Sequence, residues 1–74
     1  MKILIFNGQI YNLDMVLMIT KIDESTTSTF FRIYFNPPTI YLNLNGSTKK
    51  LIEIRNEILD FIKSKKTELI INYE

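Results

Sequence analysis

Carboxylates are the side chains of this sequence that could most directly carry out chemistry. Asp23 and Glu24 are adjacent, and Glu53, Glu57 and Asp60 recur at spacings that place them along one side of a helix. Paired carboxylates can transfer protons or bind a hard cation. A solvated helix surface is the commoner origin of this pattern, and the chain has no histidine, no cysteine and no Gly-rich phosphate loop. We therefore expect no catalytic residue, no metal site and no cofactor, and we predict that the protein is not an enzyme.

A second candidate site consists of aromatic and polar side chains that alternate with apolar ones along residues 30–45. Bases of single-stranded DNA or RNA stack on exposed rings while cations contact the phosphates, so such a set could bind nucleic acid. Tyrosine, phenylalanine and arginine are also enriched in protein interfaces, and the set could equally be ordinary cross-strand pairs on a solvated sheet. We interpret it as the candidate binding face, formed by Phe30, Arg32, Tyr34, Tyr41 and Asn43.

The alternation has a period of two, which predicts that residues 30–45 form two strands that fold back at Pro37-Pro38. A four-residue loop over residues 36–39 suits two prolines better than a tight turn does. If Phe35 lies opposite Ile40, the partners that follow include Tyr34 with Tyr41 and Arg32 with Asn43. A slip of one residue would bury the polar set of one strand, so the pattern also predicts the register. The predicted core face contains Phe31, Ile33, Phe35, Ile40, Leu42 and Leu44.

Three shorter segments complete the predicted sheet. Asn7-Gly8 between residues 2–6 and 9–12 is a strong signal for a hairpin. Residues 15–23 are largely apolar on both faces, which predicts a central strand covered on both sides. A helix over residues 14–22 is the alternative, and the β-branched residues there favour the strand. Residues 68–73 predict a last strand, either in this sheet or at the edge of a neighbouring subunit.

One helix is predicted over residues 47–66, with Ser47 as its N-cap. Its apolar stripe needs a sheet to cover, and the face that carries Phe31, Ile33 and Phe35 is the expected partner. The predicted fold class is therefore α+β: an antiparallel sheet of four to five strands with one long C-terminal helix packed on one face. Residues 1–74 form a single small domain. The stripe contains Leu51, Ile54, Ile58, Phe61 and Ile62.

This order of strands and then one long helix, over residues 2–66, resembles two groups of small proteins. One comprises the single-stranded-DNA-binding transcriptional coactivators, which have four strands and a helix. The other comprises the half-size pleckstrin-homology-like domains. The resemblance lies in topology, so no functional residue is carried over from either group.

Composition limits the functional classes further. A net charge of +1 is not the strongly basic balance of a dedicated duplex-DNA binder. No apolar run is long enough to span a membrane, and we expect a cytoplasmic protein. Alanine is absent while isoleucine, asparagine and lysine are abundant, which points to an AT-rich genome such as that of a phage or mobile element.

We therefore predict a non-catalytic small binding module, a homo-oligomeric regulator or inhibitor that acts through the aromatic and polar sheet face. Its partner would be a protein or a small ligand. The alternative is a protein that binds single-stranded DNA or RNA, and that activity would weaken steeply with salt.

Overall fold

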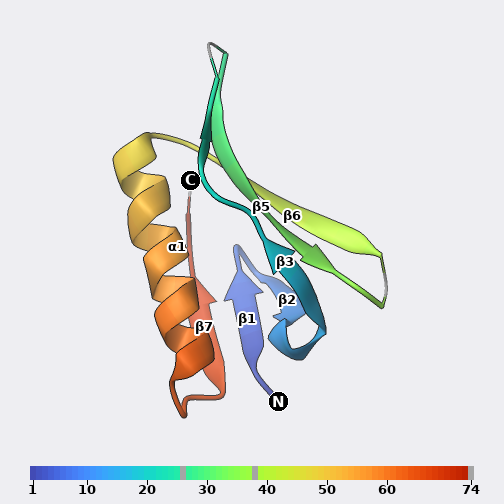
Figure 1. Ribbon diagram of the computed structural model, residues 1–74. Coiled ribbons are helices and arrows are strands. Elements are labelled where there is room, and N and C mark those ends of the chain that lie inside the picture. Colours follow the sequence, from blue (N-terminus) through green and yellow to red (C-terminus); the bar gives the residue numbers. More distant parts are fainter. Residues whose placement is uncertain (26, 38, 74) are drawn as a thin grey trace.

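The described part of the chain, residues 1–25, 27–37 and 39–73, forms a small α+β fold (Figure 1). This computed structural model contains mostly antiparallel strands and one long helix. None of the helices in these residues is long and apolar enough to cross a membrane. The elements follow in the order β1 (Ile3–Phe6), β2 (Gln9–Asn12), a 3₁₀ turn (Leu13–Met15), β3 (Val16–Ile19), β4 (Asp23–Glu24), β5 (Thr29–Phe35), β6 (Ile40–Asn45), α1 (Thr48–Lys63) and β7 (Glu68–Ile71).

The first hairpin is confirmed. β1 and β2 pair antiparallel, with Phe6 opposite Gln9. Asn7 and Gly8 form the turn between them with φ values of 49° and 83°. Positive φ at both central positions is what a two-residue hairpin loop requires, and asparagine and glycine tolerate it best.

The strands form two sheets, where the sequence predicted one. The first sheet has the order β2-β1-β7, and the second contains β3, β4, β5 and β6. The last strand, β7, pairs within the chain and runs parallel to β1, with Leu4 beside Leu69 and Phe6 beside Ile71. A parallel neighbour needs a crossover connection, and α1 provides it by returning the chain along the first sheet (Figure 1).

The second hairpin, β5–β6, has the predicted register. Phe35 lies opposite Ile40, Tyr34 opposite Tyr41 and Arg32 opposite Asn43. The predicted turn over residues 36–39 includes Pro38, which lies outside the described residues. In Figure 1 this hairpin extends to the right, away from α1.

The prediction of a central strand over residues 15–23 is wrong. A 3₁₀ turn begins the segment, and only β3 and the two-residue β4 are extended, both along the same edge of β5. Leu17 and Met18 are 69% and 50% exposed, so this edge strand is not covered on both sides. The register of β3 shifts between Val16 and Met18, so residues of this segment do not alternate regularly between two faces. The helical alternative is also wrong.

The helix is confirmed, although it ends three residues earlier than predicted. Ser47 is its N-cap and accepts a hydrogen bond from the Lys50 N–H at 3.2 Å. At the other end Ser64 takes an extended conformation, and its N–H and hydroxyl both donate to the Phe61 carbonyl. The Ser64 hydroxyl also accepts from the Lys66 N–H, so local hydrogen bonds turn the chain away from the helix axis.

One hydrophobic core joins the helix to both sheets. The apolar side of β5 is buried against it as predicted, but Ile40 is 45% exposed and does not belong to the core. Ile40 belongs to the last described pair of the hairpin, next to the turn, and this end of the hairpin extends away from α1 (Figure 1). The buried residues are Leu4, Phe6, Leu13, Phe31, Ile33, Phe35, Leu44, Leu51, Ile54, Ile58, Phe61 and Ile71.

Candidate functional site

The five residues of the candidate binding face lie together on the side of the β5–β6 hairpin that points away from the core. The register places Arg32 beside Asn43 and Tyr34 beside Tyr41. Phe30 continues the β5 row beyond Arg32. Because side chains alternate across a strand, burial of the odd-numbered residues of β5 turns these even-numbered ones outward. We call this surface the outer face.

Arg32 is the centre of the outer face. Its guanidinium carbon lies 5.0 Å from the Phe30 ring centre and 5.2 Å from that of Tyr41. Its Nε donates to Asn43 Oδ1 at 3.0 Å, and one terminal nitrogen lies 3.4 Å from the Tyr34 hydroxyl. The four partners therefore hold the guanidinium in place, in an arrangement that combines cation–π contacts with hydrogen bonds.

Electrostatics and ring packing complete this cluster. The hydrogen bond with Tyr34 is the main cause of a raised pKa at Arg32, so the guanidinium stays charged. The rings of Tyr34 and Tyr41 are 5.7 Å apart and inclined at 41°, a favourable tilted geometry. Tyr41 is 57% exposed, which leaves one ring of the cluster open to a partner.

Sequence reasoning missed three residues that extend the outer face toward β3 and β4. Met18 pairs with Tyr34 in the ladder, and Asp23 pairs with Phe30. Thr20 lies between them and binds Arg32 twice: its N–H donates to the Arg32 carbonyl, and its hydroxyl accepts from the Arg32 N–H, both at 2.9 Å. Strict alternation from Val16 would place Met18 on the same face as Val16. The register shift between them turns Met18 to the outer face instead, so the alignment could not be predicted from the alternation.

A shallow pocket of about 280 Å³ lies on this extension. Two cations and one carboxylate, Lys21, Arg32 and Asp23, are among its lining residues, together with Thr20, Phe30 and Tyr34. Two of the three charged side chains are cations, and they lie beside an aromatic ring, so the pocket could contact either a polar protein surface or a phosphate with its base.

The carboxylates considered from the sequence do not converge. Glu53, Glu57 and Asp60 are exposed on α1. Glu24 accepts a hydrogen bond from the Thr48 hydroxyl at 2.9 Å, which links β4 to the start of the helix. Among the residues that the structure describes, no group of three or more acidic, histidine or cysteine side chains could hold a metal ion.

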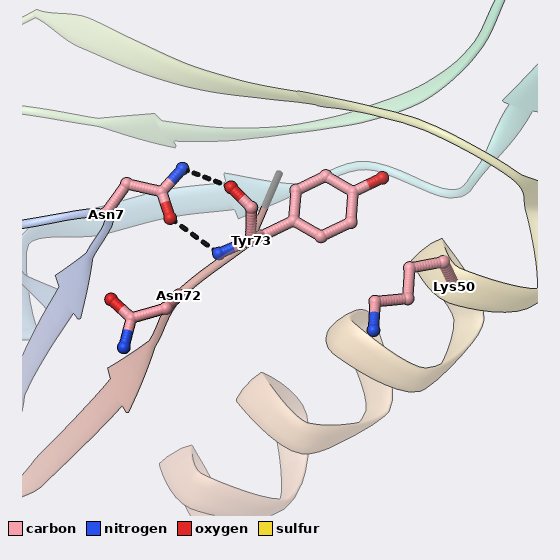
Figure 2. A pocket seen from close by; sticks show the side chains of 4 residues that line it. All are labelled: Asn7, Lys50, Asn72 and Tyr73. Atoms are coloured by element: carbon pink, nitrogen blue, oxygen red, sulfur yellow. Dashed lines mark hydrogen bonds between the residues drawn. The ribbon is translucent and has the colours of Figure 1, made fainter.

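A larger open pocket lies between the first hairpin and α1 and is lined by Asn7, Lys50, Asn72 and Tyr73 (Figure 2). The Asn7 amide binds the Tyr73 backbone twice, donating to its carbonyl at 2.7 Å and accepting from its N–H at 2.6 Å. Figure 2 shows the Tyr73 ring beside the first turns of α1. Because Asn7 is already engaged in these bonds, we assign the pocket a structural role in anchoring β7.

Comparisons with protein-family models, curated proteins and solved structures found no match. The topology also departs from the four strands and a helix of the coactivators, since six strands precede α1 in the described residues and β7 follows it. The outer face therefore has to be interpreted from its own geometry.

Proposed function

We propose that the chain is a non-catalytic, homo-oligomeric binding module, a regulator or inhibitor that binds another protein through the outer face. The observation that carries this proposal is the Arg32 cluster, in which Phe30, Tyr34, Tyr41 and Asn43 hold the guanidinium in place. Side chains fixed before binding lose little conformational entropy on association. A cytoplasmic location is part of the same proposal.

The chemistry of the outer face supports a protein partner. Exposed tyrosine, methionine and arginine are the residues that most often dominate protein interfaces. Tyr41 and Met18 are 57% and 50% exposed, and they lie on either side of Tyr34. A partner that covered this row would bury apolar surface around an arginine that already makes two side-chain hydrogen bonds within the outer face.

The first experiment selects peptides from a displayed library against the full chain and maps each binder by amide chemical shifts. We expect the shifts to centre on β5 and β6. Tyr41→Glu should weaken binding about tenfold or more, because it places a charge in an apolar contact. Ile52→Glu is the matched control, since Ile52 is also exposed, at 46%, but lies on α1. Binders that map to the helix, or that lose affinity equally in both variants, would contradict the proposal.

Single-stranded nucleic acid is the second candidate, favoured by the pocket in which Lys21 and Arg32 lie beside the Phe30 ring. A ring that stacks a base and cations that contact phosphate are the usual elements of such a site. Fluorescence anisotropy with a labelled oligothymidine at low and high salt would test it. Binding that falls steeply with salt and is abolished by Arg32→Glu would favour this candidate over a protein partner.

A further inference from the structure

Strand β6 is an unusually unprotected sheet edge. It is six residues long, contains no charged residue and no proline, and pairs in unbroken register with β5 alone among the described strands. The other edge strands are protected: β2 and β7 have four residues each, β3 contains a register shift, and β4 consists of two acidic residues. Long regular edges without charge, proline or a bulge are the ones that pair with further strands.

The hydrogen bonds at the end of the hairpin determine which backbone groups of β6 are free. Gly46 N–H donates to the Thr29 carbonyl, so these two opposed residues form a hydrogen-bonded pair. Hydrogen-bonded and non-hydrogen-bonded pairs alternate along an antiparallel ladder. The N–H and carbonyl groups of Tyr41, Asn43 and Asn45 therefore point away from β5.

Two independent contacts agree with this assignment. The Asn45 carbonyl accepts a hydrogen bond from the Tyr73 hydroxyl at 2.7 Å, as an outward group can. On the other strand, the Arg32 carbonyl accepts from Thr20 N–H, so the backbone opposite Asn43 faces β3. Tyr73 closes one end of the edge, and the groups of Tyr41 and Asn43 remain open.

We propose that β6 pairs with β6 of a second copy of this chain in an antiparallel, twofold-symmetric dimer. Tyr41 of each copy would exchange both backbone hydrogen bonds with Asn43 of the other, and Leu42 would lie opposite Leu42. A shift toward the C-terminal end would compete with Tyr73 for the Asn45 carbonyl, and a shift toward the N-terminal end would pair Asn43 with Thr39, which lies in the turn outside β6. The edge is self-complementary in this register, as a twofold interface must be.

Side chains on both surfaces of the joined sheet support the same register. On the core side, the partly buried Leu42 would contact its symmetry mate, and Ile40, 45% exposed in one copy, would lie beside Leu44 of the second. On the opposite side, Tyr41 would lie beside Asn43 of the second copy, so the two outer faces would form one continuous surface. The inference rests on the proposed function in this respect: it identifies the contact that makes the binding module a homo-oligomer.

The test measures mass and amide hydrogen exchange on the unmodified chain. Light scattering should give twice the monomer mass of 8.8 kDa, falling on dilution. Within β6, the amides of Leu42 and Leu44 bond to β5 and should exchange slowly at every concentration. The amides of Tyr41 and Asn43 should be slow in the dimer and fast after dilution.

Two variants at Asn43 separate the backbone from the side chain. Asn43→Pro removes an N–H that does not bond to β5, which edge strands tolerate, and should weaken dimerisation about tenfold or more. Asn43→Thr removes the same contact with Arg32 but keeps the N–H, and should remain dimeric. If Asn43→Pro fails to fold, hydrogen exchange of the unmodified chain decides the question by itself.

Two results would overturn the inference. One is a monomer at the highest concentration that stays in solution. The other is a dimer in which the Tyr41 and Asn43 amides exchange as fast as in the monomer. A monomeric chain that still binds peptides through the outer face would refute the dimer, and with it the homo-oligomeric part of the proposed function, but would leave the proposed binding of a protein partner intact. A dimer that pairs through β6 but binds no peptide at the outer face would support the dimer and refute the proposed binding of a protein partner.

Discussion

Gly46, directly after β6, offers a sharp test of how the end of the chain is anchored. A Cβ built on Gly46 would overlap the Tyr73 hydroxyl, whereas its distance to the Leu51 side chain would be an ordinary 3.8 Å. The Tyr73 hydroxyl donates to the Asn45 carbonyl at 2.7 Å, and the Tyr73 ring centre lies 6.3 Å from that of Phe6. The small size of residue 46 thus allows the last tyrosine to reach the second sheet.

Gly46→Ala should therefore displace the Tyr73 side chain. Loss of its hydrogen bond costs about 0.5–1.5 kcal/mol, and loss of the aromatic contact with Phe6 costs about as much again. Alanine also restricts the unfolded chain, which stabilises the protein by about 0.4–1 kcal/mol. The expected net effect is a destabilisation of about 1–2 kcal/mol, a large share of the stability of a domain of this size.

Urea unfolding followed by circular dichroism measures this effect in two backgrounds. In Tyr73→Ala the new methyl group meets no hydroxyl, and Gly46→Ala should then stabilise the protein by about 0.5 kcal/mol. The sign of the Gly46→Ala effect should thus reverse between the two backgrounds. An equal destabilisation in both would refute the reasoning, because it would show that Tyr73 is not what requires glycine at this position.

Three further changes test the fold. Ile33→Ala should lower the free energy of unfolding by about 2–5 kcal/mol because Ile33 is fully buried, whereas Ile40→Ala should lower it by less than about 1 kcal/mol. Equal urea midpoints for the two variants would contradict the difference in burial between Ile33 and Ile40. Ser47→Ala should lower the free energy of unfolding by about 1 kcal/mol through loss of the N-cap, and Ser47→Asp should largely restore it, as thermal unfolding can check. Asn7→Gly should lower the free energy of unfolding by about 1–2 kcal/mol, because it keeps the turn but removes two hydrogen bonds to Tyr73. Asn7→Ala should lower it further, since alanine also resists the positive φ of this position. If Asn7→Ala were the more stable of the two variants, the result would argue against this turn.

Local patterns predicted the parts of the fold that short-range chemistry determines. Asn7-Gly8 predicted the first hairpin because few other residues accept positive φ at two successive positions. The alternation along residues 30–45 predicted the register of β5 and β6, since a slip would have buried Arg32 and Tyr34. The outer face therefore followed from the sequence, including the neighbours Arg32 and Asn43.

Long-range packing decided the remainder. Residues 15–23 are apolar enough for a central strand, but the register shift after Val16 places Met18 beside Tyr34 on the outer face, where it is 50% exposed. No local signal indicates that Met18 and Asp23 join the outer face, because their alignment depends on that shift.

The placement of β7 shows the same division. Its sequence predicted a strand, but a strand can pair with any free edge, in its own chain or in another. Beside β1, Ile71 is buried in the core and Leu69 packs against it, and this long-range packing favours the parallel neighbour. The sequence by itself thus determined the two hairpins, the long helix, the extended last segment and which side of the long hairpin is apolar. Only the tertiary structure decided which edges are paired and that β6 stays open, because edge pairing depends on residues distant in the chain.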